Sequence, residues 1–286
     1  MRLLTLTLLA ALLLPANASA EPPARTDQRE GRLWRRSWPT FSWVEGGATV
    51  AAGVGTLVLA LRPMPSEPRW KGGILFDDSL RDALRLESAD ARQRARSIGD
   101  LPYYAAPAIP LLIDPLLVAW GVHGDQQAAL NVGLIGLEAF SYSGLLSFVS
   151  TELSRRQRPD SAECLRHRPD GVGCDMDTEA FWSGHTSIAA TSAGLVCAHH
   201  RYMPLWGHPV ADAAACVWAS SAALASGVSR LLSDRHYTTD VVLGMGIGFG
   251  IGYAVPVLLH YTRRERSVAL TLAPCAANCL ALAGSF

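Results

Sequence analysis

The sequence predicts an all-α protein: a membrane-embedded bundle of five to six apolar helices, followed by a small C-terminal β-hairpin. Apolar residues make up 49% of the 286 residues, and the mean hydropathy is +0.17. The apolar residues gather into segments of about 20, the length of a helix that crosses a bilayer. The formal net charge is zero, which argues against nucleic acid as a partner.

Six apolar segments are candidates for these helices. Asp114, Glu138 and Asp212 fall inside three of them. Because a carboxylate is costly in hydrocarbon, we expect these side chains to face the bundle interior or the interface. A largely soluble helical bundle is the alternative. The six segments are residues 44–62, 103–121, 127–149, 186–203, 208–228 and 240–260.

The first 20 residues are typical of a cleavable secretory signal. A basic start precedes an apolar run from Leu3 to Leu14, and Ala18-Ser19-Ala20 supplies small residues for cleavage. An uncleaved anchor is the alternative, which the shortness of the run disfavours. Residues 21–100 are expected to form a polar, interfacial region with one apolar helix near 44–62.

The helical domain is expected over residues 101–262, and its last segment has glycine at every second position from Gly244 to Gly252. This alternation could mimic a strand, but the length and the flanking charges favour a closely packed helix. The remaining tail, residues 263–286, has a pattern typical of two short strands and a turn.

The run SRLLSDRHYTTD, residues 229–240, carries side chains suited to a phosphoryl group. His236 and Asp240 are four residues apart and share a helix face, where the carboxylate can hold one ring nitrogen as N–H and leave the other free to attack. Arg230 adds a planar fork of donors for phosphate oxygens. Taken singly, each of these residues is more often an ordinary ion-paired or hydrogen-bonded residue.

Two further clusters precede this run. Arg158 stands at a break after an apolar helix, because Pro159 disfavours helix in the residue before it. Ser183, Gly184 and His185 stand at the start of a helical segment, where backbone N–H groups bind anions. We expect the three clusters to converge on one anion site.

Together and in this order, the three clusters resemble the signature of the type 2 phosphatidic acid phosphatase superfamily, which also contains bacterial class A acid phosphatases and vanadium haloperoxidases. The resemblance covers roughly residues 100–262. Trp182 stands where the family usually has proline, and Thr151 stands where it has lysine. Because the single lysine of the chain is Lys71, Arg155 or Arg156 is left to compensate.

The resemblance implies a two-step displacement that requires no metal and no other cofactor. His236 would attack phosphorus while Asp240 orients its imidazole. His185 would protonate the leaving oxygen and then activate the water that hydrolyses the phosphohistidine. The phosphate-binding groups would be Arg158, Arg230, Ser183 and the backbone of Gly184.

The activity implied is that of a membrane phosphatase acting on a phosphate monoester or pyrophosphate. A lipid phosphate is the expected substrate, because the site lies at helix ends beside the bilayer. Two alternatives stay open. One is a vanadium-dependent haloperoxidase, which the missing lysine disfavours. The other is a catalytically impaired family member that acts as a binding or scaffold protein at the membrane.

The site is expected to face the periplasm from a bacterial inner membrane. Arg263, Arg264 and Arg266 follow the last helix, and positive charge is typical of the cytoplasmic side. A cleaved signal followed by three crossings would place the site in the cytoplasm, so we expect residues 44–62 to pack against the bundle without crossing.

The chain has six cysteines. Cys164 and Cys174 lie in one loop and could form a disulfide if that loop is exported. A second possible pair is Cys275 with Cys279. Cys197 and Cys216 fall within apolar helices and are expected to be packing residues.

Overall fold

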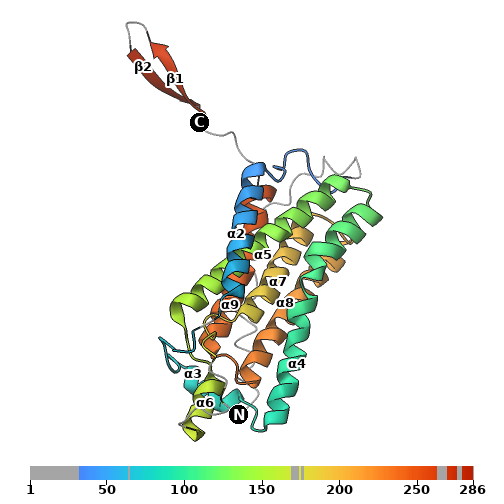
Figure 1. Ribbon diagram of the computed structural model, residues 1–286. Helices are drawn as coiled ribbons and strands as arrows, with labels where there is room; N and C mark the ends of the chain where they lie inside the picture. The colour runs from blue at the N-terminus through green and yellow to red at the C-terminus, as the bar shows by residue number, and fades with distance from the viewer. Residues whose placement is uncertain are drawn as a thin grey trace. The chain divides into compact units, whose positions relative to one another are not determined.

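The computed structural model describes residues 32–63, 65–168, 174, 177–262, 269–275 and 279–285. Residues 32–262 form a bundle of long helices, with short helices at one end (Figure 1). This confirms the expected all-α class. The predicted signal peptide, residues 1–20, lies outside the described residues.

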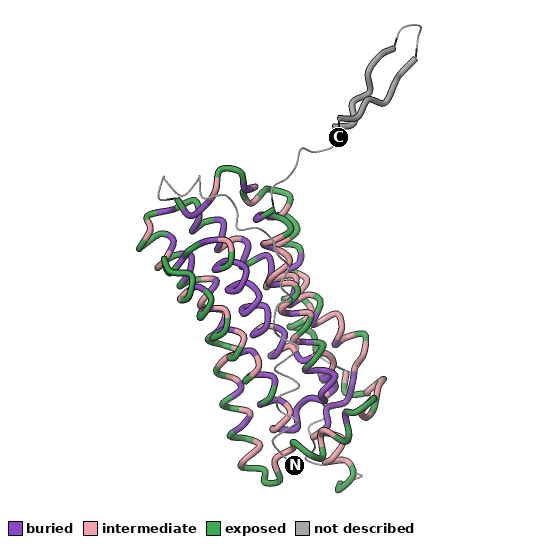
Figure 2. Tube along the Cα trace, turned by 180° about the vertical axis from the view of Figure 1, so that it is seen from behind, coloured by how far each residue is buried: buried purple, intermediate pink, exposed green. Residues whose placement is uncertain are grey.

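The centre of the bundle is α7 (Gly184–Tyr202). It packs against α5 (Gln126–Ser154), α8 (Pro209–Leu232) and α9 (Thr238–Pro256), and η4 (Val257–Tyr261) continues α9. Most of α7 is buried, and Figure 2 shows burial concentrated inside the bundle. Its polar residues find partners there: the hydroxyl of Thr191 donates to the carbonyl of Ser187 at 2.8 Å and lies 2.8 Å from the hydroxyl of Ser143.

A seam of glycines joins α9 to α7. A Cβ on Gly248 would lie only 2.2 Å from the carbonyl oxygen of Ser187, whereas one on Gly250 would meet open space. The alternating glycines therefore split between two faces of a helix, as small residues do where helices approach closely. This confirms a helix in place of a strand. The glycines on the α7 face are Gly244, Gly248 and Gly252.

The remaining elements surround this centre. The helix α2 (Trp43–Leu61) begins at a capping box formed by Ser42 and Glu45 and packs along α5. The helix α4 (Ala89–Ala105) packs on α8 and is bent by 44° from the π-helical segment η3 (Ile109–Val122). Two short helices, α3 (Asp77–Leu84) and α6 (Pro159–His167), lie together at one end (Figure 1).

Four described helical segments are long and apolar enough to cross a membrane, and a fifth appears if α4 and η3 count as one bent span. The expected span at 186–203 is different. It forms a helix, α7, but its mean hydropathy does not place it among these candidates. Because its neighbours bury it, α7 can carry hydroxyl side chains that lipid would not tolerate. The four are α2, α5, α8 and Thr238–Tyr261.

The segment before α2 packs into the bundle at the end opposite the short helices. Trp34 and Trp38 are 2% and 6% exposed, while Trp43 is 97% exposed. The carboxylate of Asp125 accepts hydrogen bonds from the backbone N–H groups of Leu33 and Trp34, at 2.8 and 3.1 Å. Trp34 and Trp38 are therefore core residues of a region, residues 21–100, that the sequence predicts to be polar and interfacial.

The structure pairs four cysteines. A disulfide joins Cys164 to Cys174, which confirms the pairing considered from the sequence. A second disulfide joins Cys197 on α7 to Cys216 on α8, so the prediction that these two are packing residues was wrong. Both lie in apolar helices, and the sequence does not show that the two helices bring them together.

The C-terminal segment contains two strands, β1 (Ala269–Cys275) and β2 (Cys279–Ser285), which pair antiparallel. Their side chains are outside the described part of the structure, as is a bond between Cys275 and Cys279. A hairpin appendage therefore stays a prediction.

Candidate active site

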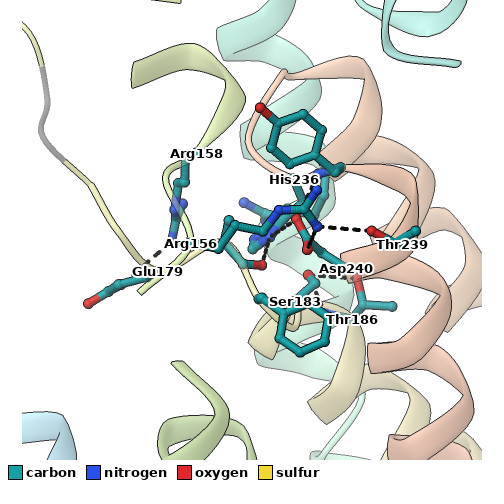
Figure 3. Close-up of polar contacts among 12 residues, drawn as sticks. Arg156, Arg158, Glu179, Ser183, Thr186, His236, Thr239 and Asp240 are labelled. Atoms are coloured by element: carbon teal, nitrogen blue, oxygen red, sulfur yellow. Dashed lines mark hydrogen bonds and ion pairs between the residues drawn. The ribbon is translucent and has the colours of Figure 1, made fainter. Parts of the chain in front are cut away.

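The structure brings all three predicted clusters to one end of the bundle, beside α3 and α6 (Figures 1 and 3). Arg158 follows the end of α5, Ser183 caps the start of α7, and His236 lies in the turn between α8 and α9. This convergence follows from helix direction, because α5 and α8 end where α7 and α9 begin.

The imidazole of His236 is buried and held by a backbone carbonyl. Its Nδ1 lies 2.7 Å from the carbonyl oxygen of Ala180. Since a carbonyl can only accept, Nδ1 carries the hydrogen and Nε2 is left unprotonated in the neutral ring. Burial, and next the charge of Arg158, place the pKa of His236 well below its usual value. The ring is therefore a neutral imidazole with one nitrogen able to act as a nucleophile.

Asp240 lies near this ring but does not hydrogen-bond to it. Its Oδ2 is 3.9 Å from Nδ1 of His236, so the orienting contact comes from Ala180. Asp240 instead joins the three clusters. Its Oδ1 lies 2.5 Å from Nη1 of Arg156, its Oδ2 accepts from the N–H of Tyr237 at 2.8 Å, and its backbone carbonyl accepts from the N–H of Ser183 at 3.1 Å.

Arg156 is fully buried behind Asp240, with its guanidinium carbon 4.1 Å from the ring centroids of both Trp70 and Tyr237. Such stacking fixes the plane of a guanidinium and so the directions of its donors. Trp70 belongs to the segment between α2 and α3, and its backbone carbonyl accepts from the N–H of Gln157 at 2.9 Å. A part of the chain outside the predicted motifs thus builds the back wall of the site.

The five N–H donors of Arg156 are all engaged within the protein. Nε and Nη2 donate to the carbonyl of Gly72 at 3.2 and 3.0 Å, and Nη2 also donates to Oδ2 of Asp77 at 2.7 Å. Nη1 donates to Thr239 at 2.9 Å and to Asp240 (Figure 3). Because every donor has a partner, this guanidinium is a structural clamp with none left for a substrate phosphate.

Arg155, the other candidate to compensate for the family lysine, and Thr151, which stands at the lysine position, also have partners of their own. Arg155 adopts a left-handed conformation (φ 41°) as the C-cap of α5, and its Nη2 lies 2.6 Å from the carboxylate of Glu152. The hydroxyl of Thr151 donates to the carbonyl of Phe181 at 3.3 Å. Ser150 and Ser154 donate to the same carbonyl. Thr151 therefore supports the loop that carries Ala180.

Arg158 precedes His185 in the chain and Arg230 lies between the two histidines, but both arginines act on His236 electrostatically. Nε of Arg158 is 2.9 Å from a carboxylate oxygen of Asp177, and its Nη2 is 3.5 Å from Glu179 (Figure 3). Arg230 is 2% exposed and donates from Nη2 to Asp100. Both guanidinium groups are thus held in fixed positions before any substrate arrives.

Ser183, Gly184 and His185 form the start of α7. Oγ of Ser183 accepts from the backbone N–H of Thr186 at 3.4 Å and lies 2.9 Å from its hydroxyl (Figure 3). The N–H groups of Gly184 and His185 belong to the first turn, which lacks intrahelical acceptors, so they suit an anion. The side chain of His185 is 30% exposed. Burial, and next the charge of Arg230, lower its pKa to about 3.

Sequence reasoning missed the carboxylates that fix these arginines. Asp77 begins α3, is fully buried, and accepts from Arg156, from the N–H of Thr239 and from its hydroxyl. Burial and the hydrogen bond from Arg156 act on its pKa in opposite senses, and the net shift is downward. Asp100 lies on α4. Both lie in residues 21–100, which the sequence predicts to be a polar, interfacial region, and the only available signal was that buried arginines need partners.

The described residues hold no group of three or more histidine, cysteine or acidic side chains arranged to bind a metal ion. Their chemistry is that of an anion site: buried guanidinium groups, a helix N-terminus, one neutral imidazole and one partly exposed imidazole. A site with these features is suited to phosphoryl transfer.

The comparison with protein families agrees. Residues 132–264 match the PAP2 superfamily, and this match supports a phosphatase-type activity. It confirms the family resemblance, which rested on three short motifs. No curated protein and no solved structure matched the chain.

Proposed function

We propose that this protein is a membrane phosphatase that hydrolyses a phosphate monoester or pyrophosphate, of a lipid, through a phosphohistidine formed on His236. One observation carries the proposal. The ring of His236 is fixed through Nδ1 to the carbonyl of Ala180 at 2.7 Å, which leaves Nε2 as the nucleophilic atom beside two arginines. A histidine in this state does not need to lose a proton before it attacks.

In the first step, Nε2 of His236 bonds to phosphorus and the bond from phosphorus to the leaving oxygen breaks. Protonated His185 gives its proton to that oxygen. The phosphorylated ring keeps its Nδ1–H and gains positive charge, and the carboxylate of Asp240, 3.9 Å from Nδ1, stabilises that charge. In the second step, His185 takes a proton from water, the water oxygen bonds to phosphorus, and the phosphorus–nitrogen bond breaks.

Charge builds on the equatorial oxygens of phosphorus in the transition state. Arg158 and Arg230 supply guanidinium donors, and the first turn of α7 supplies backbone N–H groups. Ser183 fixes that turn as its N-cap. Arg156 supports the site indirectly, because it is committed to Asp77 and Asp240. The site therefore uses two arginines and a helix terminus in the absence of the family lysine.

The position of the site supports a lipid substrate. It is at the ends of α5 and α8, two helices that are long and apolar enough to span a membrane. A headgroup at the bilayer surface would reach this end of the bundle without leaving the membrane. Soluble phosphomonoesters present the same terminal group, so they serve as the comparison in the test below.

The test is release of inorganic phosphate in detergent, with a chelator present, from lipid monophosphates, lipid diphosphates and soluble monoesters. Wild type should prefer the lipid substrates, and in His236→Ala the rate of phosphate release should fall on the order of 10⁴-fold or more. Phosphate binding without turnover on any substrate would instead support a binding or scaffold protein. Halide oxidation that depends on added vanadate would support a haloperoxidase.

We also propose that the site faces the periplasm from a bacterial inner membrane, with Arg263, Arg264 and Arg266 on the cytoplasmic side. Because α2 itself has the length and hydropathy of a span, this orientation puts the residues before it on the cytoplasmic side, in conflict with the cleaved signal and the non-crossing segment 44–62 expected from the sequence. The check is a membrane-impermeant maleimide on intact cells, with single cysteines at Asp90 near the site and Gln127 at the other end. Labelling at 127 but not at 90 would refute this orientation.

A further inference from the structure

A carboxylate on α4, Asp100, lies between two side chains of the proposed active site. Its Oδ1 accepts a hydrogen bond from Nη2 of Arg230, and the same oxygen is 3.4 Å from Nε2 of His185. Asp100 is 35% exposed, so it lies at the open side of the site. One oxygen atom therefore faces both the guanidinium and the imidazole.

Close packing fixes the part of α4 that carries this carboxylate. A Cβ on Gly99 would lie 1.6 Å from the hydroxyl oxygen of Ser229, so only glycine fits at this approach to α8. The hydroxyl of Ser226 donates to the carbonyl of Gly99 at 3.3 Å. The residue before Asp100 is therefore locked against the helix that carries Arg230.

The same face of α4 also contacts His185 through an aromatic ring. The ring of Tyr103 lies 4.2 Å from that of His185, at an interplanar angle of 35°. Tyr103 is three residues after Asp100, so the two side chains share a helix face. Asp100 thus contacts a nitrogen of the imidazole, and Tyr103 packs against the ring itself.

The two histidines of the site differ in the partner that each ring nitrogen meets. His236 bonds to a carbonyl, which fixes the tautomer of a neutral ring. His185 faces a carboxylate, which stabilises a protonated ring. A nucleophile must be neutral, whereas a general acid must carry a proton for one step. The carbonyl partner of His236 therefore suits a nucleophile, and the carboxylate partner of His185 suits a general acid, because the surroundings of a titratable group set its role.

The other charges around His185 work against its protonation. Arg230, Arg158 and Arg96 each lower its pKa, and Asp100 is the neighbour that raises it. In the substrate complex, the bound phosphate adds further negative charge beside the ring. Asp100 and the phosphate then act in the same sense, so the proton needed by the leaving oxygen can reside on His185.

We propose that Asp100 is the positioning residue of the acid–base histidine: it accepts Nε2–H of His185, so that Nδ1 gives and takes the proton, and it anchors Arg230. This inference rests on the proposed phosphatase function. In the first step the proton on Nδ1 moves to the leaving oxygen, and in the second the Nδ1 lone pair takes a proton from water; throughout, the proton on Nε2 stays on the ring, hydrogen-bonded to Asp100.

The test compares Asp100→Asn with Asp90→Asn, a matched change at an exposed carboxylate in the first turn of α4. Two soluble substrates separate the roles: an alkyl phosphate, whose leaving oxygen needs a proton, and p-nitrophenyl phosphate, whose leaving group departs as an anion. For Asp100→Asn, kcat on the alkyl phosphate should fall about 30- to 100-fold, within the range of acid–base help. On p-nitrophenyl phosphate the loss should be below about 5-fold.

The pH profile supplies a second readout. Without the carboxylate the proton leaves His185 more readily, so the basic limb of kcat should move to lower pH in Asp100→Asn. Asp90→Asn should match wild type on both substrates. Equal losses on the two substrates would show that Asp100 acts only by holding Arg230, and no loss would remove it from the mechanism. Either result overturns the proposal.

A measurement without turnover keeps this test separate from that of the proposed function. The His185 ring is followed by NMR in protein labelled with nitrogen-15 histidine, assigned with His185→Gln, with and without inorganic phosphate. Asp100→Asn should change the protonation or tautomer of this ring, and Asp90→Asn should not. An unchanged His185 signal overturns the inference, even if wild type hydrolyses every substrate tried. Absence of all turnover would refute the proposed function instead.

Discussion

The two ends of the bundle contain similar residue types in different arrangements. At the far end, both ring nitrogens of His200 face carboxylates: Nδ1 is 2.7 Å from Asp212 and Nε2 is 3.5 Å from Asp114. Nε2 of His260 is 3.7 Å from Glu138. These five side chains, called here the far-end cluster, are all buried. At the site end, His236 meets a carbonyl and His185 is partly exposed.

The difference shows that the partner decides what a buried histidine can do. In the far-end cluster, imidazole and carboxylate face each other in a buried interior: His200 hydrogen-bonds to Asp212, and the contacts to Asp114 and Glu138 are longer ion pairs. At the site end the carboxylates are taken by arginines, so one imidazole keeps a free nitrogen and guanidinium groups stand beside it. Only the second arrangement can receive and transfer a phosphoryl group.

The largest effect should come from breaking the far-end cluster. His200→Ala leaves Asp212 and Asp114 buried without their imidazole, which typically costs about 3–5 kcal/mol. We expect a large fall in Tm in detergent, with turnover per folded molecule unchanged. The control is His167→Ala, whose side chain is 76% exposed and whose pairing with Glu163 should be worth less than about 1 kcal/mol. A loss of turnover in folded His200→Ala would end the distinction between the two ends.

The next effect concerns arginine at the site end. Arg158→Gln removes a guanidinium beside the phosphate, and loss of one such donor typically lowers kcat by about 10²–10³-fold. Arg201→Gln, an exposed arginine in the last turn of α7, is the matched change at the far end and should leave kcat/KM within about 2-fold. Equal activity of the two variants in phosphate release would remove Arg158 from the site.

The glycine seam between α7 and α9 connects the two ends, and single substitutions in it should change the stability of the protein. Gly248→Ala drives a Cβ against the carbonyl of Ser187, and overpacking of this kind costs about 1–3 kcal/mol. Gly250→Ala points into open space and should be neutral, or stabilising by up to about 1 kcal/mol through helix propensity. Tm values in the same detergent compare the two. If Gly250→Ala were the more damaging, the α7 and α9 packing would be refuted.

The smallest effect is on pH dependence. Because the pKa of His236 is lowered, its ring stays neutral as pH falls below 6.5, so kcat/KM should not drop between pH 7.5 and about 5.5. An unfolded chain binds protons on His236 and His185 below about pH 6.5 while the folded one does not, so stability should decrease as pH falls through that range. Between pH 7.5 and 4.5, the Tm of His236→Gln should decrease by less than the Tm of wild type. Parallel curves would contradict this.

Much of the fold could be predicted because it depends on local patterns. Apolar segments and their lengths gave the helices, and three short motifs gave the phosphate chemistry. The prediction failed where a partner comes from far along the chain. Cys197 and Cys216 form a disulfide across two helices, and Asp77 and Asp100 lie more than 75 residues before the arginines that they hold.

The sequence by itself determined the helical class, the order of the elements and the residue types of the site, because hydrophobic patterning and motif spacing are local properties. Tertiary structure alone decided which acceptor each imidazole and each arginine meets. Arg156 and Arg158 are two residues apart, yet one is a clamp saturated by Asp77, Asp240, Thr239 and Gly72, and the other stands beside His236. The physical reason is that a hydrogen bond depends on distances between atoms, and distances between remote segments are set only when the helices pack.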